Sequence, residues 1–346
     1  MRIMKIAKLL KENGIRRTCG VLCNYAEYSL HRRHVFSFPS AIDIEVTSRC
    51  PLACMHCPRT HREALGLEFP IGDMDRAKGL ELIRSLRGVR RIAFQGYGEP
   101  LIYPHIFEFL AEARQSRIFT AFSTSAAVVN DKMLAGLKEC PPDLLTFSCD
   151  AVNMRYDDGV RENLNIEHYQ DNVAAIIDAV RSSAKPVEIL FHTCIVGDNY
   201  KYLDDIVAFA AKQGVKTLDI SELNISFLEK WLDRLLPQDK ELMMTAVDKA
   251  KETGAERGVT VGFTPQYVAQ DKKKVNCRYL WQHPFITWQG ELTPCCGRPF
   301  ASQFTLGNVF DKGFYALWNS EQIKQMRHDI ANLNCPDICR GCPYAP

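Results

Sequence analysis

The feature that most constrains the fold is a regular alternation of short apolar runs with amphipathic helical stretches over residues 40–225. Strands that alternate with helices in this way are typical of βαβ units and of a parallel sheet. Six such units are too few to close the eight-stranded barrel of this class, so the pattern predicts an α/β fold with a partial (β/α)6 TIM-like barrel. Ligand chemistry is expected at the carboxyl ends of the strands. The predicted strands are Ala41–Thr47, Arg91–Gln95, Phe119–Ser123, Leu144–Ser148, Val187–Cys194 and Lys216–Ser221.

The chain beyond residue 225 has a different pattern. A helix is predicted over Gln238–Glu256 and a short strand over Val259–Thr264. Farther on, Phe285–Trp288 and Glu291–Thr293 are predicted to pair as a hairpin around a glycine turn. We therefore expect three parts: an N-terminal helical segment over residues 1–38, the barrel over 39–225, and a linker helix with a small β-hairpin and helix domain over 226–346.

Composition excludes several classes of protein. The 346 residues carry a net charge of only +2, so no strong attraction to nucleic acid is expected. No apolar run approaches the roughly 20 residues that a membrane-spanning helix requires. The fourteen cysteines are concentrated in two places rather than spread over a short secreted scaffold, which indicates metal binding in a reducing compartment. A cytoplasmic location is expected.

The first concentration of cysteines is the loop directly after the first predicted strand. Cys50, Cys54 and Cys57 have C-x3-C-x2-C spacing. Thiolates are the ligands that iron–sulfur clusters require, and three of them leave one iron of a four-iron cluster open for a chelating molecule. Zinc is the alternative, but structural zinc is usually closed by four ligands in paired C-x2-C units. Because no fourth cysteine is nearby, the spacing favours a cluster.

These residues resemble the radical S-adenosylmethionine (SAM) superfamily. In that family the residue before the third cysteine, here His56, lies near the adenine of the cofactor. Gly98-Glu99-Pro100 is similar to the family's glycine-rich motif, which receives the amino group of the cofactor. Tyr97 stands where the family often has another glycine, and it is our one candidate for a catalytic residue.

The resemblance extends to the following strands. Ser123 matches a position that contacts the methionyl carboxylate, and Ser148 and Asp150 match the segment that contacts the ribose. The resemblance implies that a 4Fe–4S cluster binds SAM and reduces it to methionine and a 5′-deoxyadenosyl radical, which abstracts a hydrogen atom from the substrate. It also implies a low-potential electron donor such as flavodoxin or ferredoxin.

The second concentration of cysteines lies in the tail and resembles the Twitch or SPASM extensions that bind auxiliary clusters in this superfamily. The predicted ligands of one auxiliary 4Fe–4S cluster are Cys277, Cys295, Cys339 and Cys342. Cys296 is interpreted as a bystander, because two adjacent residues do not easily reach one small cluster. Cys335 is left open, either as a replacement for Cys339 or as a ligand of a second cluster. Structural zinc is the alternative here too, since four thiolates also suit zinc.

The substrate is the least constrained part of the prediction. Relatives of this size with one short extension often act on carbohydrates or aminocyclitols, so we expect a small molecule of that kind and its oxidation, epimerisation or decarboxylation. The alternatives are a peptide-modifying enzyme that crosslinks or oxidises residues, and an iron–sulfur electron-transfer or zinc-binding module without chemistry of its own. Residues expected near the barrel mouth are Tyr97, His192, Asp198, Glu222, Arg278 and Trp288.

Overall fold

A computed structural model describes residues 18–152, 160–223, 235–265, 275 and 277–346 of the chain. Its strands form one sheet in the order β10-β9-β8-β1-β2-β3-β4-β5-β6-β7. The first seven strands are all parallel to their neighbours. They are β1 (Ala41–Ile44), β2 (Arg91–Phe94), β3 (Phe119–Thr124), β4 (Leu144–Ser148), β5 (Glu188–Ile195), β6 (Thr217–Glu222) and β7 (Thr260–Thr264).

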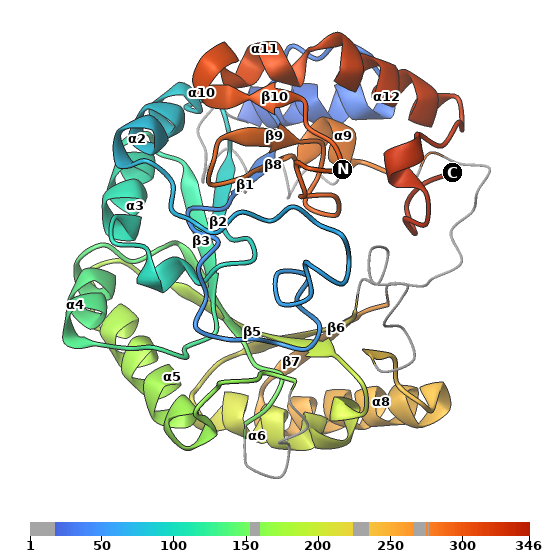
Figure 1. Cartoon of the computed structure of the whole chain (residues 1–346). Coiled ribbons are helices and arrows are strands. Elements are labelled where there is room, and N and C mark those ends of the chain that lie inside the picture. Colours follow the sequence, from blue (N-terminus) through green and yellow to red (C-terminus); the bar gives the residue numbers. More distant parts are fainter. Residues whose placement is uncertain (1–17, 153–159, 224–234, 266–274, 276) are drawn as a thin grey trace.

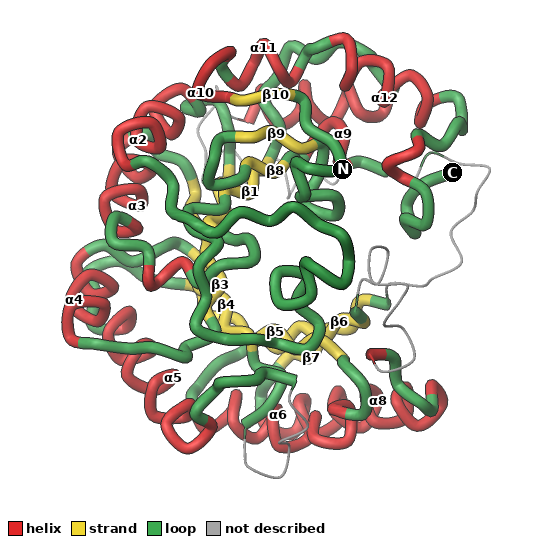
Figure 2. The backbone as a smooth tube through the Cα atoms, in the orientation of Figure 1, coloured by secondary structure: helices red, strands yellow, loops and turns green. Residues whose placement is uncertain are grey.

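Helices cover the outer side of this curved sheet (Figure 1), and the loop that follows β1 lies on its inner side. The strands carry buried apolar side chains such as Ile42 and Phe94, which pack against the apolar faces of the helices. Figure 2 shows the resulting arrangement of an inner wall of strands and an outer ring of helices. The outer helices are α2 (Arg76–Ser85), α3 (Ile106–Gln115), α4 (Asp131–Glu139), α5 (Ile166–Arg181), α6 (Leu203–Lys212) and α8 (Lys240–Arg257).

Several helix boundaries follow from local sequence. Asp75 precedes α2 and accepts a hydrogen bond from the Lys78 N–H, and Asp239 caps α8 in the same way. At the other end of α8, Gly258 adopts φ +70°, a left-handed conformation that ends helices at low cost for glycine. None of the described helices is long and apolar enough to cross a bilayer.

The partial TIM-like barrel predicted from the sequence is confirmed. Every one of the six predicted strands is present, with ends shifted by no more than a few residues. The short strand predicted at Val259–Thr264 pairs in parallel with β6, so the curved sheet continues to a seventh parallel strand. The alternation of strand and helix therefore extends to α8 and β7, past the boundary placed at residue 225.

The C-terminal residues continue the same sheet. Strand β8 (Phe285–Ile286) pairs in parallel with β1, and β9 (Glu291–Thr293) returns antiparallel to β8 as the predicted hairpin. Strand β10 (Gly307–Asn308) adds a further antiparallel pair. The helices of this C-terminal part are α9 (Tyr279–Gln282), α10 (Val309–Lys312), α11 (Phe314–Trp318) and α12 (Glu321–Ala331), with the short turn η5 (Asp337–Cys339). Two further short turns, η1 (Pro100–Ile102) and η3 (Asn199–Tyr202), belong to the barrel.

The N-terminal residues pack on the C-terminal part rather than forming a separate unit. The helical residues 18–29 place the Asn24 amide against the carbonyl of Trp281 at 2.8 Å. The Trp281 indole in turn donates to the carbonyl of Arg32. The fully buried Arg327 guanidinium donates to the carbonyls of Arg33, Leu280 and Trp318. Residues 1–17 of the predicted N-terminal segment lie outside the described residues.

Candidate functional site

The loop that carries Cys50, Cys54 and Cys57 is fixed by backbone hydrogen bonds. The Ala53 N–H donates to the carbonyl of Glu162 at 3.0 Å, and the Cys57 N–H donates to the carbonyl of Cys54 at 3.1 Å. Burial raises the pKa of all three thiols, and that of Cys54 reaches about 11. The thiols therefore stay protonated unless a metal takes the place of their protons.

These thiols face a cavity of about 370 Å³ on the inner side of the sheet. It is lined by the cysteine loop, by the residues after β2, by the ends of β3 and β4, by Arg161 and Leu223, and by Cys296 in the loop after β9. Of the predicted cofactor residues, all but Pro100 and Asp150 line it. The lining residues are Cys50, Leu52, Cys54, His56, Cys57, Pro58, Gln95, Gly96, Tyr97, Gly98, Glu99, Ser123, Thr124, Ser125, Ser148, Arg161, Leu223 and Cys296.

Gly98 packs directly on the start of the cysteine loop. A Cβ atom there would lie 2.0 Å from the carbonyl oxygen of Thr47, so the position admits no side chain. The next residue, Glu99, donates its N–H to the Arg49 carbonyl at 2.9 Å. Its buried carboxylate accepts both the N–H and the hydroxyl of Ser125, at 2.7 and 2.6 Å. The Glu99 side chain thus holds the loops after β2 and β3 together at the cavity wall.

Pro100 and Asp150 do not lie on the cavity. Pro100 is buried at the start of η1. Asp150 is buried beside Arg161, whose two nitrogens donate to one of its oxygens at 2.9 and 2.6 Å, and the other oxygen accepts the Cys194 N–H. Although burial acts to raise it, this guanidinium holds the pKa of Asp150 below its usual value. Arg161, which sequence analysis missed, is the member of the pair that faces the cavity.

The cavity wall has the donor chemistry that an iron–sulfur cluster and a nucleoside require. Three thiols converge on it, and sulfur ligands suit iron–sulfur clusters. The His56 side chain is half-buried, and its buried Nδ1 has no hydrogen-bond partner among the described residues. Burial lowers the pKa of His56 to about 4, so the ring is neutral and suited to pack against a flat base. No three His, Cys, Asp or Glu side chains of the described residues are grouped to hold a single metal ion.

The C-terminal cysteines influence one another electrostatically. The charges of Cys277 and Cys342 both act on Cys295, and Cys339 is influenced by all three. Burial is the main cause that raises the pKa of Cys277 to about 11 and that of Cys295 to about 12. Electrostatic interactions therefore connect Cys277, Cys295, Cys339 and Cys342, and Cys335 also acts on Cys339. That these four thiols hold one auxiliary cluster stays a prediction.

Two features hold this second group in place. Arg298 is buried and donates to the carbonyls of Ile338 and Arg340, at 2.6 and 2.7 Å, on either side of Cys339. Gly290 turns the hairpin with φ +87°, and a Cβ there would lie 2.4 Å from the Phe310 ring. The guanidinium thus ties the C-terminal loop to the hairpin.

Cys296, the predicted bystander, lies in the wall of the first cavity. Its neighbour Cys295 interacts with Cys277 and Cys342 of the tail, whereas the Cys296 thiol interacts with Asp43 of β1. The Asp43 carboxylate also accepts a hydrogen bond from His283 at 2.8 Å. Of the two adjacent cysteines, Cys296 is the one that lines the first cavity, although both act electrostatically on Tyr97.

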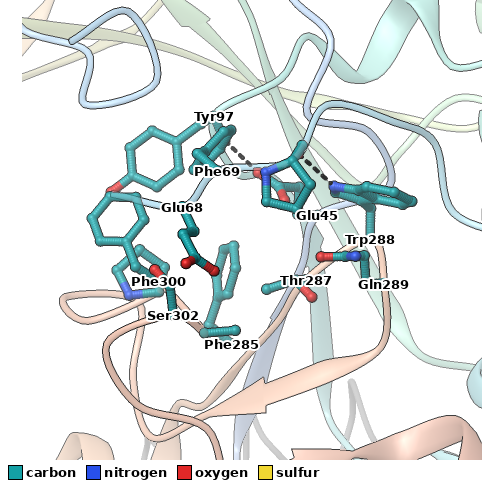
Figure 3. A pocket seen from close by; sticks show the side chains of 13 residues that line it. Glu45, Glu68, Phe69, Tyr97, Phe285, Thr287, Trp288, Gln289, Phe300 and Ser302 are labelled. Carbon is teal, nitrogen blue, oxygen red and sulfur yellow. Dashed lines mark hydrogen bonds between the residues drawn. The ribbon is translucent and has the colours of Figure 1, made fainter. Parts of the chain in front are cut away.

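Figure 3 shows a second cavity, of about 220 Å³, which shares the lining residue Tyr97 with the first one. The Tyr97 ring stacks on Phe300 with centroids 5.3 Å apart, and Phe69 meets it edge-on at 5.8 Å. The Tyr97 N–H donates to the buried carboxyl group of Glu45 at 2.9 Å. Trp288 also lines this second cavity, so two of the residues expected near the barrel mouth, Tyr97 and Trp288, belong to it.

Both cysteine regions match models of known protein families. Residues 44–210 match the model of the radical SAM superfamily, and residues 277–343 match that of the SPASM iron–sulfur cluster-binding domain. The chain belongs to the radical SAM superfamily. This radical SAM enzyme uses SAM together with a SAM-binding and an auxiliary 4Fe–4S cluster. The electron-transfer and zinc-module alternatives are thereby wrong.

Curated relatives align over most of the chain. A protein of Pyrococcus furiosus, the tungsten-containing aldehyde ferredoxin oxidoreductase cofactor-modifying protein, is 25% identical over 86% of this chain and 86% of its own. The PqqA peptide cyclase of Xanthomonas campestris is 25% identical over 88% of this chain and 79% of its own. That of Gluconobacter oxydans is 24% identical over 88% and 82%.

Solved structures share the fold. The crystal structure of Streptococcus suis SuiB bound to SAM matches with a TM-score of 0.67 and 14% identity, over 94% of this chain and 77% of SuiB. The anSMEcpe structure with bound SAM and the Kp18Cys peptide matches with a TM-score of 0.58 and 13% identity, over 87% and 86%. Both likenesses concern the fold.

The expected carbohydrate or aminocyclitol-like small molecule is wrong, both as substrate and as partner. Relatives that align over most of the chain are named for the cyclisation of a peptide, PqqA. The error came from arguing substrate class from chain length, which does not report on what a site admits. The peptide-modifying alternative agrees better with these relatives.

Proposed function

We propose that this radical SAM enzyme modifies a peptide, by joining two of its residues or by oxidising one. The observation that carries the proposal is the alignment with PqqA peptide cyclases over 88% of the chain. The candidate cluster ligands are Cys50, Cys54 and Cys57 for the SAM-binding cluster. Those for the auxiliary cluster are Cys277, Cys295, Cys339 and Cys342. The cytoplasmic location belongs to this proposal, because reduced thiols must be kept available for cluster assembly.

We assign the first cavity to SAM and the second to a side chain of the substrate. When bound to its cluster, SAM supplies the radical that removes a hydrogen atom from a carbon of the substrate. The chain's own residues orient the reactants: His56 and Arg161 lie in the wall of the first cavity, and Tyr97 lines both cavities. The second cavity, at about 220 Å³, is smaller than the roughly 300–1,000 Å³ of most ligand pockets. It fits one side chain of a peptide whose remainder lies outside.

The test uses the anaerobically purified protein with both clusters reconstituted, SAM and dithionite. The peptides encoded beside the gene are added one at a time, and mass spectrometry follows each peptide and the 5′-deoxyadenosine formed. We expect one peptide to lose two hydrogen atoms, or to gain an oxidised residue, in step with 5′-deoxyadenosine. Formation of 5′-deoxyadenosine with every peptide left unchanged contradicts the proposal.

A further inference from the structure

The second cavity combines aromatic and acidic lining residues. Five of its thirteen lining residues are aromatic, and two are glutamates, Glu45 and Glu68. Figure 3 shows the Glu68 carboxylate pointing toward the interior of the ring of labelled side chains. Lysine, arginine and histidine are absent from the thirteen described lining residues. The aromatic members are Phe69, Tyr97, Phe285, Trp288 and Phe300.

Glu45 is a buried acidic side chain of this cavity. It is only 3% exposed, and its hydrogen bonds come from backbone N–H groups, including that of Tyr97. Within the described part of the chain it forms no ion pair. Burying a carboxylate without a cation is costly, and burial accordingly raises the pKa of Glu45 to about 7. A cation brought by a ligand would remove this cost.

The aromatic walls suit the same ligand. The faces of aromatic rings attract cations within about 6 Å, and cages of several rings are a known way to hold substituted ammonium groups. Here the stacked pair Tyr97 and Phe300 forms one wall, with Phe69 set edge-on to both at 5.8 and 5.9 Å. The apolar stem of a long cationic side chain would pack on these rings.

We propose that the second cavity binds the cationic side chain of a lysine or arginine of the substrate peptide, held between the aromatic rings and paired with Glu45 and Glu68. This inference rests on the proposed peptide-modifying function, because it names the residue type that the enzyme admits beside the SAM cavity. The shared wall residue Tyr97 brings that side chain next to the cofactor site.

The experiment measures binding and needs no turnover. N-acetyl-lysine methylamide, N-acetyl-arginine methylamide and the neutral N-acetyl-norleucine methylamide are titrated into the reconstituted enzyme, with dissociation constants from calorimetry. We expect the two cationic probes to bind at least tenfold more tightly than the norleucine probe. Glu45→Gln is expected to lower the affinity for lysine at least tenfold.

Further variants keep the test decisive. Because Glu45 is buried and its replacement can disturb folding, Glu68→Lys is the second variant: its side chain is exposed, and the reversed charge is expected to abolish binding of the lysine probe. Glu252→Gln, at an exposed position of α8, is the matched control and is expected to bind like the parent. Equal binding of the norleucine and lysine probes, no binding of the lysine probe, or unchanged binding by both Glu45→Gln and Glu68→Lys would overturn the inference.

The outcome separates this inference from the proposed function. If the lysine probe binds as expected but no peptide is modified, the peptide-modifying function fails and the cation site stands. If a peptide is modified while the probes show no preference for charge, the cation site fails and the function stands.

Discussion

The two cysteine groups of this enzyme are assembled in opposite ways. Cys50, Cys54 and Cys57 share one short loop, whose backbone hydrogen bonds set their positions. The C-terminal group joins Cys277 and Cys295 to a loop near the end of the chain, through a hairpin and a buried guanidinium. A local site depends on its own loop, whereas a site assembled from distant segments depends on the fold around it. A substitution that destabilises the fold is therefore expected to release iron from the C-terminal group before it affects the first group.

The largest expected effect separates the two groups by function. Cys54→Ala removes one of the three thiols of the first cavity and is expected to abolish 5′-deoxyadenosine formation. About four iron atoms per chain, those of the auxiliary cluster, are expected to remain. Product is measured by chromatography and iron by colorimetric assay. Loss of all iron would mean that the two groups are not independent.

The adjacent cysteines give the sharpest test of the C-terminal group. Cys295→Ala is expected to lose about four iron atoms per chain, because its thiol interacts with Cys277 and Cys342 and is a predicted ligand. Cys296→Ala is expected to keep the full iron content, since its thiol faces Asp43 and the first cavity. Iron content and the cluster absorption spectrum are measured on both. Equal loss of iron in the two variants would show that Cys296 also holds the auxiliary cluster.

A moderate effect is expected from the guanidinium that ties the C-terminal loop. Hydrogen bonds from a charged donor contribute about 1.5–3 kcal/mol each, and Arg298→Met removes two of them. We expect the unfolding temperature to fall by about 5–10 °C and auxiliary iron to be released faster to a chelator. Arg340→Met, at an exposed side chain, is the control and is expected to change neither. Scanning calorimetry under anaerobic conditions measures the first quantity.

The smallest expected effect is the pH dependence of binding at the second cavity. The pKa of Glu45 is raised to about 7, so its carboxyl group takes up a proton and loses its negative charge as the pH falls through that value. The groups that face it are the Tyr97 and Trp288 backbone and the second acid of the cavity, Glu68. Affinity for the lysine probe is expected to drop roughly tenfold between about pH 8 and about pH 6. Titrations at several pH values measure it, and a flat profile would exclude Glu45 as the paired charge.

Sequence reasoning succeeded where the signal is local or periodic. The alternation of apolar and polar residues predicted the strands of the barrel to within a few residues, because each strand must bury its apolar side chains against helices. The spacing of Cys50, Cys54 and Cys57 needs no tertiary information. The hairpin was also predictable, since Gly290 supplies the positive φ of its turn.

Sequence reasoning failed where the answer depends on which way a side chain points. Cys296 reaches the first cavity only because the hairpin is aligned with β1, a pairing between distant segments. Arg161 can be identified as a residue of the cavity wall only from the structure, where it pairs with the buried Asp150. Glu45 did leave a signal, since Asp43 and Glu45 alternate with apolar residues in the first strand and so share one face.

The pairing of β8 with β1 has a consequence for synthesis of the enzyme on the ribosome. The residues of β1 emerge early, but Phe285 and Ile286, which complete its outer edge, emerge late. Until then this edge presents unpaired backbone groups, and bare strand edges readily recruit other chains. A nascent chain that stalls before residue 284 is therefore expected to aggregate, however well the remainder of its barrel has formed.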